Sequence, residues 1–275
     1  SADTPVLPEP DTQSFEPIAD LEVALDRLNA QRILSGLLPL TVDPALSAGC
    51  AAHVAYMIAA GRLVREEDPS EPGFSAEGAA AGKGALLASG MDRTSDAVDA
   101  WLAHLYHRVQ VLDPGIGSVG IASDAGYACL DVFTAWVPLD DYPPILYPGR
   151  DQTDVPIAFD PVQGVSPLPF DLKPPTGPTI SLTFAPVHQL EAGFSATLTS
   201  ALASEPLAAD VRLPLDANNP YLAYQRNTVA LIPEAPLAPG TTYVIEMQGL
   251  IDAVYTTRSW SFTTRVEAAP TSSVD

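Results

Sequence analysis

The segment from His53 to Ala122 decides the fold of the first half of this chain. It reads HVAYM at 53–57, REEDPSEPGFSAEGAAAG at 65–82, WLAHLYHR at 101–108 and VLDPGIGSVGIA at 111–122. This order predicts a helix, an acid-rich loop, a Glu-Gly segment, a helix that ends in His-Arg, and a Gly-rich strand. Three of the four histidines lie in this segment, so the candidate chemistry gathers there.

Cap residues predict further helices around this segment. Asp20 is placed to cap a first helix, and Asp43-Pro44 combines an N-cap with proline at the first helical position of a second, which ends at Gly61. Thr94 or Ser95 can cap a third helix. Residues 118–123 and 127–136 then form a predicted β-hairpin around Asp124-Ala125-Gly126. Helices packed on a small antiparallel sheet indicate an α+β domain.

Three stretches of this half together resemble the CAP superfamily of cysteine-rich secretory, antigen 5 and pathogenesis-related 1 proteins, in its bacterial extracellular type. They are LNAQRILSGLLPLTVDPAL at 28–46, EGAAAG at 77–82 and WLAHLYHR at 101–108. The resemblance implies an α-β-α sandwich with a central cleft over residues 18–137. Residues 1–17 would be an irregular lead-in.

The resemblance also implies the residues of the cleft. Family members often set two histidines and one or two glutamates around it, and here Glu77 and His107 match two of these positions. His104 lies near the position of a second acid, and Arg65 stands where the other histidine is expected. We therefore predict a binding cleft lined by Arg65, Glu77, His104 and His107, with an Arg65–Glu77 ion pair inside it.

The side chains themselves leave several roles open for this set. Two imidazoles three residues apart on a helix, with one carboxylate, can hold Zn²⁺ with an open position. His107 and Glu77 can instead serve as a catalytic acid/base pair. Structural hydrogen bonding is the third role, and we expect it for His53, which lies on the apolar stripe of the second helix. No cofactor is predicted, and the sequence has no nucleophile motif of a known hydrolase.

This half also contains a pair of cysteines and a run of acidic residues. Cys50 and Cys129 fall on a predicted helix and a predicted strand of one domain, which permits a disulfide. We predict this disulfide because the other features point outside the cell, and two buried free thiols are the alternative. Glu66, Glu67 and Asp68 form an acidic run. A solvated loop is the simpler interpretation of this run, and a Ca²⁺ site is a weaker one because oxygen-rich loops suit hard cations.

The second half has a different character. Eleven of the 28 prolines fall within 138–178, which predicts a linker or an extended, edge-like segment. Short alternating runs follow and predict a β-sandwich over 179–265, with strands at 179–184, 195–199, 228–232, 243–248 and 259–264. The segment VALIPEAPLAPGTTYVIEMQGLID and the closing WSFTT resemble a bacterial Ig-like domain. Residues 266–275 are predicted to be a tail.

Charge and hydropathy exclude several classes of partner. The net charge is −21, and both halves are acidic, with 7 Lys and Arg against 20 Asp and Glu up to residue 140 and 6 against 14 afterwards. Such a field repels phosphate backbones, so nucleic acid is not an expected partner. No apolar run is long enough for a transmembrane helix. We expect a protein that is secreted or lies at the cell surface.

The function predicted from these features is a non-catalytic binding module whose cleft accepts a small apolar or cell-envelope ligand. An extracellular peptidase-like hydrolase, with His107 as the base and Glu77 as its orienting partner, is the alternative. A second alternative is a structural subunit of a surface layer or filament that self-associates, which the acidic, Pro-rich second half favours.

Overall fold

The computed structural model describes residues 17–161, 165–169, 172–217 and 219–266. Most of the predicted lead-in, residues 1–16, and nearly all of the predicted tail, residues 267–275, lie outside these ranges. Within them, no helix is long and apolar enough to cross a membrane.

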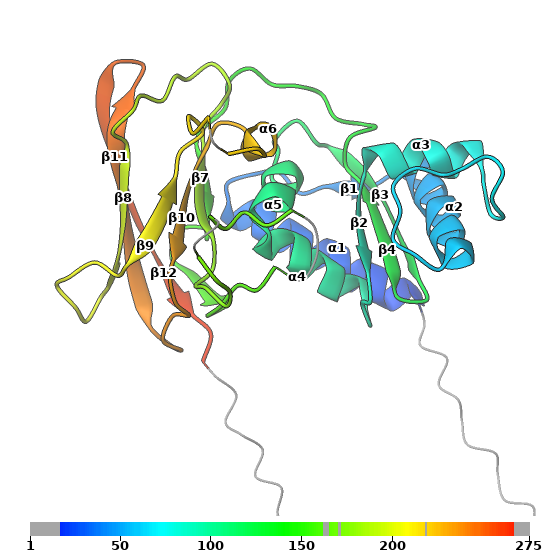
Figure 1. Cartoon of the computed structure of the whole chain (residues 1–275), viewed down its shortest axis with the longest axis horizontal. Coiled ribbons are helices and arrows are strands. Elements are labelled where there is room, and N and C mark those ends of the chain that lie inside the picture. Colours follow the sequence, from blue (N-terminus) through cyan, green and yellow to red (C-terminus); the bar gives the residue numbers. More distant parts are fainter. Residues whose placement is uncertain (1–16, 162–164, 170–171, 218, 267–275) are drawn as a thin grey trace, which may run out of the picture.

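The first half is a four-stranded sheet with helices on both faces (Figure 1). Helices α2 and α3 cover one face, and α1, α4 and α5 lie on the other. The strand order is β1-β3-β4-β2. This arrangement confirms the predicted mixture of helices and sheet. The elements are α1 (Pro17–Leu34), β1 (Thr41–Val42), α2 (Pro44–Ala60), α3 (Ala76–Gly84), β2 (Ala85–Ser89), α4 (Thr94–Ala103), α5 (Leu105–Val111), β3 (Ser118–Asp124) and β4 (Tyr127–Asp131).

Local signals set the ends of several elements as predicted. The Asp43 carboxylate accepts hydrogen bonds from the backbone N–H groups of Ala45 and Leu46, and Gly61 ends α2 in the left-handed conformation with φ 64°. The β3–β4 turn places Ala125 and Gly126 at φ 45° and 83°, as a tight hairpin requires. Strand β4 ends five residues earlier than the predicted strand, because Asp131 accepts from the N–H groups of the following turn.

Asp20 has a different role from the predicted one. It lies inside α1, which begins at Pro17, and its carboxylate accepts from the backbone N–H of Thr94. It therefore caps α4, a helix that starts 74 residues later. The predicted caps of that helix, Thr94 and Ser95, lie within its first turn, and the N-cap position belongs to Arg93, whose side chain makes no cap hydrogen bond.

The helix that carries the two site histidines is broken between α4 and α5. His104 has an extended backbone, with φ −82° and ψ 117°, and separates the two helices. The carbonyl groups freed at the end of α4 find other donors: the Arg108 guanidinium donates to Leu102 O at 2.8 Å and to Ala103 O at 3.1 Å. The Thr179 hydroxyl also donates to Ala103 O. Tertiary contacts therefore replace the helical hydrogen bonds that the continuous pattern predicted.

The second half is a β-sandwich of two four-stranded sheets, ordered β5-β7-β10-β9 and β6-β12-β11-β8. The five predicted strands all form, and they share one apolar core that includes Leu182, Leu231, Ile245 and Phe262. Strands β5 and β6 come from within the Pro-rich segment 138–178 and pair with β7 and β12. The elements are β5 (Ile145–Tyr147), β6 (Gln152–Val155), β7 (Ile180–Thr183), β8 (Ser195–Ser200), β9 (Ala209–Arg212), α6 (Leu222–Gln225), β10 (Thr228–Pro233), β11 (Thr242–Ile251) and β12 (Val254–Thr264).

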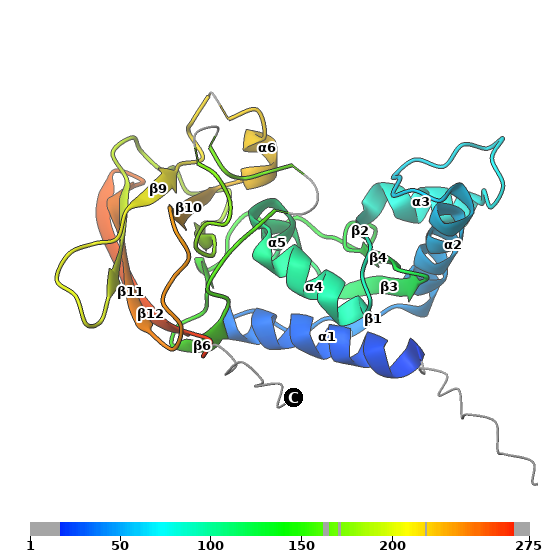
Figure 2. The ribbon, with the colours of Figure 1, turned by 60° about the horizontal axis from the view of Figure 1, so that its bottom comes forward.

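The two halves pack directly on each other through α5 (Figure 2). Leu105, Tyr106 and Val109 of α5 form an apolar cluster with Ala230 of β10. On the other side of the same helix, Arg108 Nη2 donates to the Thr179 carbonyl and hydroxyl oxygens just before β7, at 2.9 and 3.0 Å. Val111 of α5 lies in the core of the first half, and the cluster with Ala230 is separate from both main cores. Helix α5 thus joins the two halves, and this joint brings distant segments together around one cavity.

Candidate functional site

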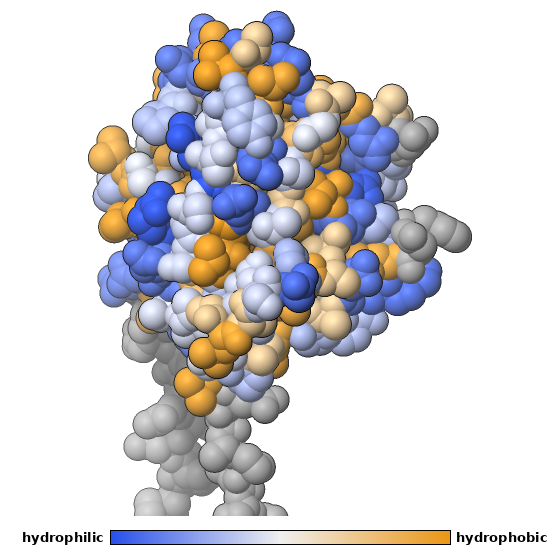
Figure 3. Space-filling view, turned by 90° about the vertical axis from the view of Figure 1, so that its left-hand side faces the viewer, coloured by the Kyte–Doolittle hydropathy of each residue, from blue (hydrophilic) through white to orange (hydrophobic). Residues whose placement is uncertain are grey.

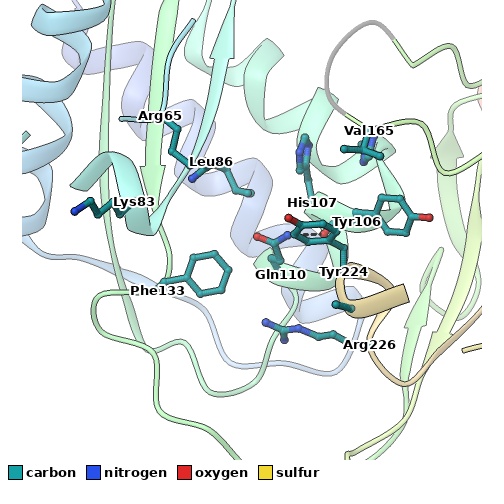
Figure 4. A pocket seen from close by; sticks show the side chains of 12 residues that line it. Arg65, Lys83, Leu86, Tyr106, His107, Gln110, Phe133, Val165, Tyr224 and Arg226 are labelled. Atoms are coloured by element: carbon teal, nitrogen blue, oxygen red, sulfur yellow. Dashed lines mark hydrogen bonds between the residues drawn. The ribbon is translucent and has the colours of Figure 1, made fainter. Parts of the chain in front are cut away.

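A cavity of about 600 Å³ lies between the α-β-α half and the β-sandwich (Figure 4). Helix α5 and the segment that contains α6 form one side, and the end of α3 with β2 forms the other. Three of the four predicted cleft residues line it. The complete lining is Arg65, Lys83, Leu86, His104, Tyr106, His107, Gln110, Phe133, Val165, Ala223, Tyr224 and Arg226.

A buried histidine–glutamate pair holds the segment that carries Arg65. His53 Nδ1 lies 2.9 Å from Glu67 Oε1, and His53 Nε2 donates to Val64 O at 2.9 Å. The second Glu67 oxygen accepts from the N–H of Ser75. Both side chains are fully buried, which confirms the predicted structural role of His53. The pair connects both ends of the 64–75 loop to α2, so the backbone at Arg65 is held in place.

The glycines of the EGAAAG stretch allow α3 to lie close to this pair. A Cβ atom at Gly82 would lie 2.4 Å from His53 Cε1 and 2.5 Å from Arg65 O. A Cβ atom at Gly78 would lie 2.4 Å from Glu67 Oε1. Larger residues would push the helix away, so both glycines are required by close packing. Arg65 in turn donates to Gly82 O at 3.0 Å and to Ala85 O at 2.7 Å.

His104 and His107 stack on each other at the wall of the cavity, with ring centroids 4.3 Å apart. His104 is 4% exposed, and neither of its ring nitrogens has a hydrogen bond of normal geometry within the described part of the chain. A neutral imidazole carries one donor and one acceptor, and leaving such groups buried without partners is unfavourable. Unpaired buried polar atoms of this kind are typical of sites that receive a ligand or water.

Burial keeps both imidazoles uncharged. It lowers the pKa of His104 from 6.5 to about 3, with a smaller contribution from the neighbouring His107. Burial also lowers the pKa of His107 to about 4, assisted by the positive charge of Arg65. Near neutral pH both rings are therefore neutral hydrogen-bonding groups.

These shifts predict acid sensitivity. Because the folded-state pKa values lie below the unfolded value, the unfolded chain binds protons first as the pH falls from 6.5 towards 4. This contribution to stability is nearly complete above pH 6.5, and we expect it to fall by about 3 kcal/mol between pH 7 and about pH 5.3. Urea titrations across this range will measure it. The double variant H104N/H107N should show a clearly flatter profile, and an unchanged slope would contradict this origin of the pH dependence.

Glu77 lies apart from the other predicted cleft residues. It is exposed in the first turn of α3 and does not line the cavity, whereas Lys83 at the other end of the same helix does. The predicted Arg65–Glu77 ion pair is wrong, because no such contact exists among the described residues and Arg65 donates to backbone carbonyls. The reason is geometric: six helical residues separate Glu77 from Lys83 by about 9 Å along the axis.

The acidic run before α3 also differs from a single solvated loop. Glu67 is buried against His53, whereas Glu66 and Asp68 are exposed. Asp68 Oδ1 accepts from the N–H and hydroxyl of Ser70. Within the described ranges, no three His, Cys, Asp or Glu side chains are arranged to hold a metal ion.

The structure adds residues that the sequence did not point to. Lys83, Arg226 and Tyr224 line the cavity, as do Phe133 and Val165. Their contribution depends on the packing of the two halves, so no local motif marks them. One signal in the sequence could have pointed to Lys83. The chain has only 13 Lys and Arg residues, so a cation that lies next to a site motif is a candidate for the site.

The predicted disulfide is present. Cys50 of α2 and Cys129 of β4 are bonded, with a sequence separation of 79 residues. Both residues are fully buried in an apolar cluster with Val54, Met57 and Ala85. The bond fixes α2 to the sheet and, through His53, supports the segment that carries Arg65.

Comparison with known proteins finds a similarity over part of the chain. Residues 25–137 match the family model described as CAP, the cysteine-rich secretory protein family, which confirms the predicted CAP-like domain over these residues. A solved structure of an extracellular protein containing an SCP domain, from Bacillus anthracis, aligns with 16% identity and a TM-score of 0.38. The alignment covers 48% of this chain and 45% of that one. Among curated protein sequences, none matches this chain.

Proposed function

We propose that this protein is a non-catalytic binding protein that holds a small molecule in the cavity between its two halves. The observation that carries the proposal is His104, whose two buried ring nitrogens have no hydrogen bond of normal geometry within the described residues and lie at the wall of a cavity of about 600 Å³. Cavities of this size are typical of small-molecule sites. Apolar residues such as Phe133 and Val165 line this one together with polar groups that can orient a ligand. An apolar compound or a fragment of a cell-envelope polymer is the ligand class we propose.

The proposal places the protein outside the cell. The match of residues 25–137 to a family described as secretory supports this location. The disulfide supports it as well, because such bonds persist in oxidising compartments. In this proposal the CAP-like part is of the bacterial extracellular type and ends near residue 137. The β-sandwich is an Ig-like domain, and it contributes one wall of the site in addition to acting as a spacer.

The geometry gives less support to the hydrolase alternative. A peptidase that uses His107 as a base needs an orienting group. No described carboxylate lines this cavity, and Asp160, which lines the smaller cavity on the other side of His107, makes no hydrogen bond to it among the described contacts. This alternative predicts release of product from a fluorogenic peptide mixture that is abolished in H107A. The binding proposal predicts no turnover in either protein.

The structural-subunit alternative depends on self-association. The end face of the β-sandwich, shown in Figure 3, carries hydrophobic residues interleaved with hydrophilic ones. Interfaces of stable homo-oligomers have a more apolar centre. Small-angle scattering over a range of concentrations distinguishes a structural subunit from a monomeric binding protein. The radius of gyration of a filament or layer subunit increases with concentration, and that of a monomeric binding protein does not.

Ligand-dependent melting tests the proposed function. The ligand set is a panel of phenylpropyl compounds together with an N-acetylmuramoyl dipeptide. At saturation we expect at least one compound to raise the melting temperature by about 5 °C. Ala223 is exposed and lines the cavity, so A223W should fill the site and abolish the shift, whereas A203W, at a remote exposed turn, should keep it. No shift with any compound, or an equal shift in A223W, would contradict the proposal.

A further inference from the structure

We infer that the cavity takes a small organic anion, a carboxylate or phosphate that carries a short apolar group, an inference that rests on the proposed function. Three of the chain's 13 Lys and Arg residues, Arg65, Lys83 and Arg226, line this cavity, although the net charge is −21. No described lining residue is an acid. The composition of this acidic chain does not by itself predict a cluster of cations without acids.

Arg65 and Lys83 bring positive charge without a neutralising partner. The Arg65 guanidinium donates only to the carbonyl oxygens of Gly82 and Ala85, which are neutral, and the described residues give neither Arg65 nor Lys83 an ion pair. The two side chains lie on the same side of the cavity in Figure 4. A guanidinium without an ion pair, with an exposed ammonium group on the same wall, favours a carboxylate or phosphate nearby.

Arg226 supplies the third cation from the opposite half. It forms an ion pair with Asp113, which joins the two halves beside the cavity. Its backbone has φ 52° and ψ −150°, a conformation that non-glycine residues rarely adopt. Backbone strain of this kind is common in functional sites, where surrounding contacts hold it. The ion pair thus fixes the position of a cation at the rim.

A second cavity extends the site behind the histidine pair. It has a volume of about 150 Å³ and shares His104 and His107 with the first. Its other walls are mostly apolar and comprise Leu87, Ala88, Met91, Ala100, Trp101, Ala103, Phe159, Asp160 and Pro161. The site therefore has a cationic chamber and a smaller apolar chamber, with two neutral imidazoles between them. A molecule with an anionic head and a short apolar group fits this site, with its head in the cationic chamber and its apolar group in the smaller one.

The charge of the whole chain limits the size of the ligand. A polyanion would meet the repulsive field of an acidic surface, whereas a small anion inside the cavity responds mainly to charges within about 8 to 10 Å. The inference therefore concerns small organic anions. Free acids and phosphate monoesters share this chemistry, and a pair of compounds that differ only in the anionic head separates them.

Affinities for four compounds with the same apolar group test the inference: 3-phenylpropionate, 3-phenylpropyl phosphate, 3-phenylpropanol and 3-phenylpropylamine. Calorimetry should show that at least one anion binds roughly 10-fold or more tightly than the alcohol, and that the amine binds more weakly than the alcohol. The ratio of the two anion affinities identifies carboxylate or phosphate as the preferred head. Raising the salt concentration should weaken anion binding and leave alcohol binding nearly unchanged.

Matched variants connect the effect to the site. K83M should weaken binding of the preferred anion by roughly 10-fold and leave the alcohol unaffected, because one charge-assisted contact is lost. R258M removes the same charge from an exposed position on β12 and should change neither affinity. If the alcohol binds as tightly as both anions, the anion inference is overturned while the proposed binding function stands. If none of the four compounds binds, the inference is also overturned, and the muramoyl dipeptide of the broader panel decides whether the binding function survives.

Discussion

Replacing Arg108 with methionine is expected to lower the free energy of unfolding by about 3 to 5 kcal/mol, because the carbonyl oxygens of Leu102 and Thr179 lose this buried donor and Ala103 O keeps only the Thr179 hydroxyl. Arg108 is 1% exposed, and its guanidinium donates to the carbonyl oxygens of Leu102, Ala103 and Thr179. Its charged plane also lies over the ring of Tyr147, 3.9 Å from the centroid. The side chain thus joins the end of α4 to the β-sandwich.

Methionine keeps most of the volume but removes every donor. Burial is unfavourable to the cation itself and lowers the pKa of Arg108 to about 10, so its removal returns part of the free energy. The net effect is still a loss, because the carbonyl groups of Leu102 and Thr179 would remain buried without this donor at a cost of about 1 to 3 kcal/mol each, while Ala103 O keeps the Thr179 hydroxyl. These acceptors belong to the backbone and cannot be removed together with the arginine, unlike the partner in a side-chain ion pair.

Urea denaturation followed by tryptophan fluorescence measures this effect. R150M is the control, because Arg150 also donates to a backbone carbonyl, that of Ser259, but does so at the surface. We expect a change of less than about 0.5 kcal/mol for R150M. A loss below about 1 kcal/mol in R108M would show that other contacts hold the two halves together.

Reduction of the Cys50–Cys129 disulfide is expected to destabilise the protein by about 4 kcal/mol. The bond closes a loop with 79 residues of sequence separation, so breaking it gives the unfolded chain much greater freedom. Both cysteines are fully buried between α2 and β4, so the native contacts around them can remain when the bond is absent.

The measurement compares urea midpoints of the oxidised and reduced protein. The double variant C50A/C129A should have a urea midpoint equal to that of the reduced protein or slightly lower. Reductant should not change the midpoint of this variant. A wild-type protein that is equally stable with and without reductant would contradict the expected contribution of the bond. Because α2 also carries His53, we expect the reduced protein to lose affinity at the cavity before it unfolds completely.

Much of the fold follows from signals that act over a few residues. Asp43-Pro44 and Gly61 bound α2, and Asp124-Ala125-Gly126 makes the hairpin, because caps and tight turns depend on nearby backbone conformation. Alternation predicts the five later strands, since one face of each is buried. It does not locate strands β5 and β6, because prolines and short lengths hide them within segment 138–178.

The candidate site follows from the sequence only in part. Arg65, His104 and His107 do line one cavity, whereas Glu77 does not, because it starts a helix whose other end faces the site. The helical pattern around His104 is continuous in sequence, and nothing local indicates the break. The break depends on Arg108 and Thr179, which both donate to Ala103 O at the end of α4. Arg108 also donates to Thr179 itself, across 71 residues of sequence separation.

The sequence by itself determined the layered first half, the strand-rich second half, the cysteine pair and the location of three site residues. Periodicity, capping, composition and short family motifs carry these features, and all of them are properties of neighbouring residues. Only the tertiary structure decided that Asp20 caps a distant helix, that α5 joins the two halves, and that Lys83 and Arg226 reach one cavity from different halves. The physical reason is that packing between segments more than 70 residues apart fixes these contacts, and no local pattern encodes which surfaces will meet.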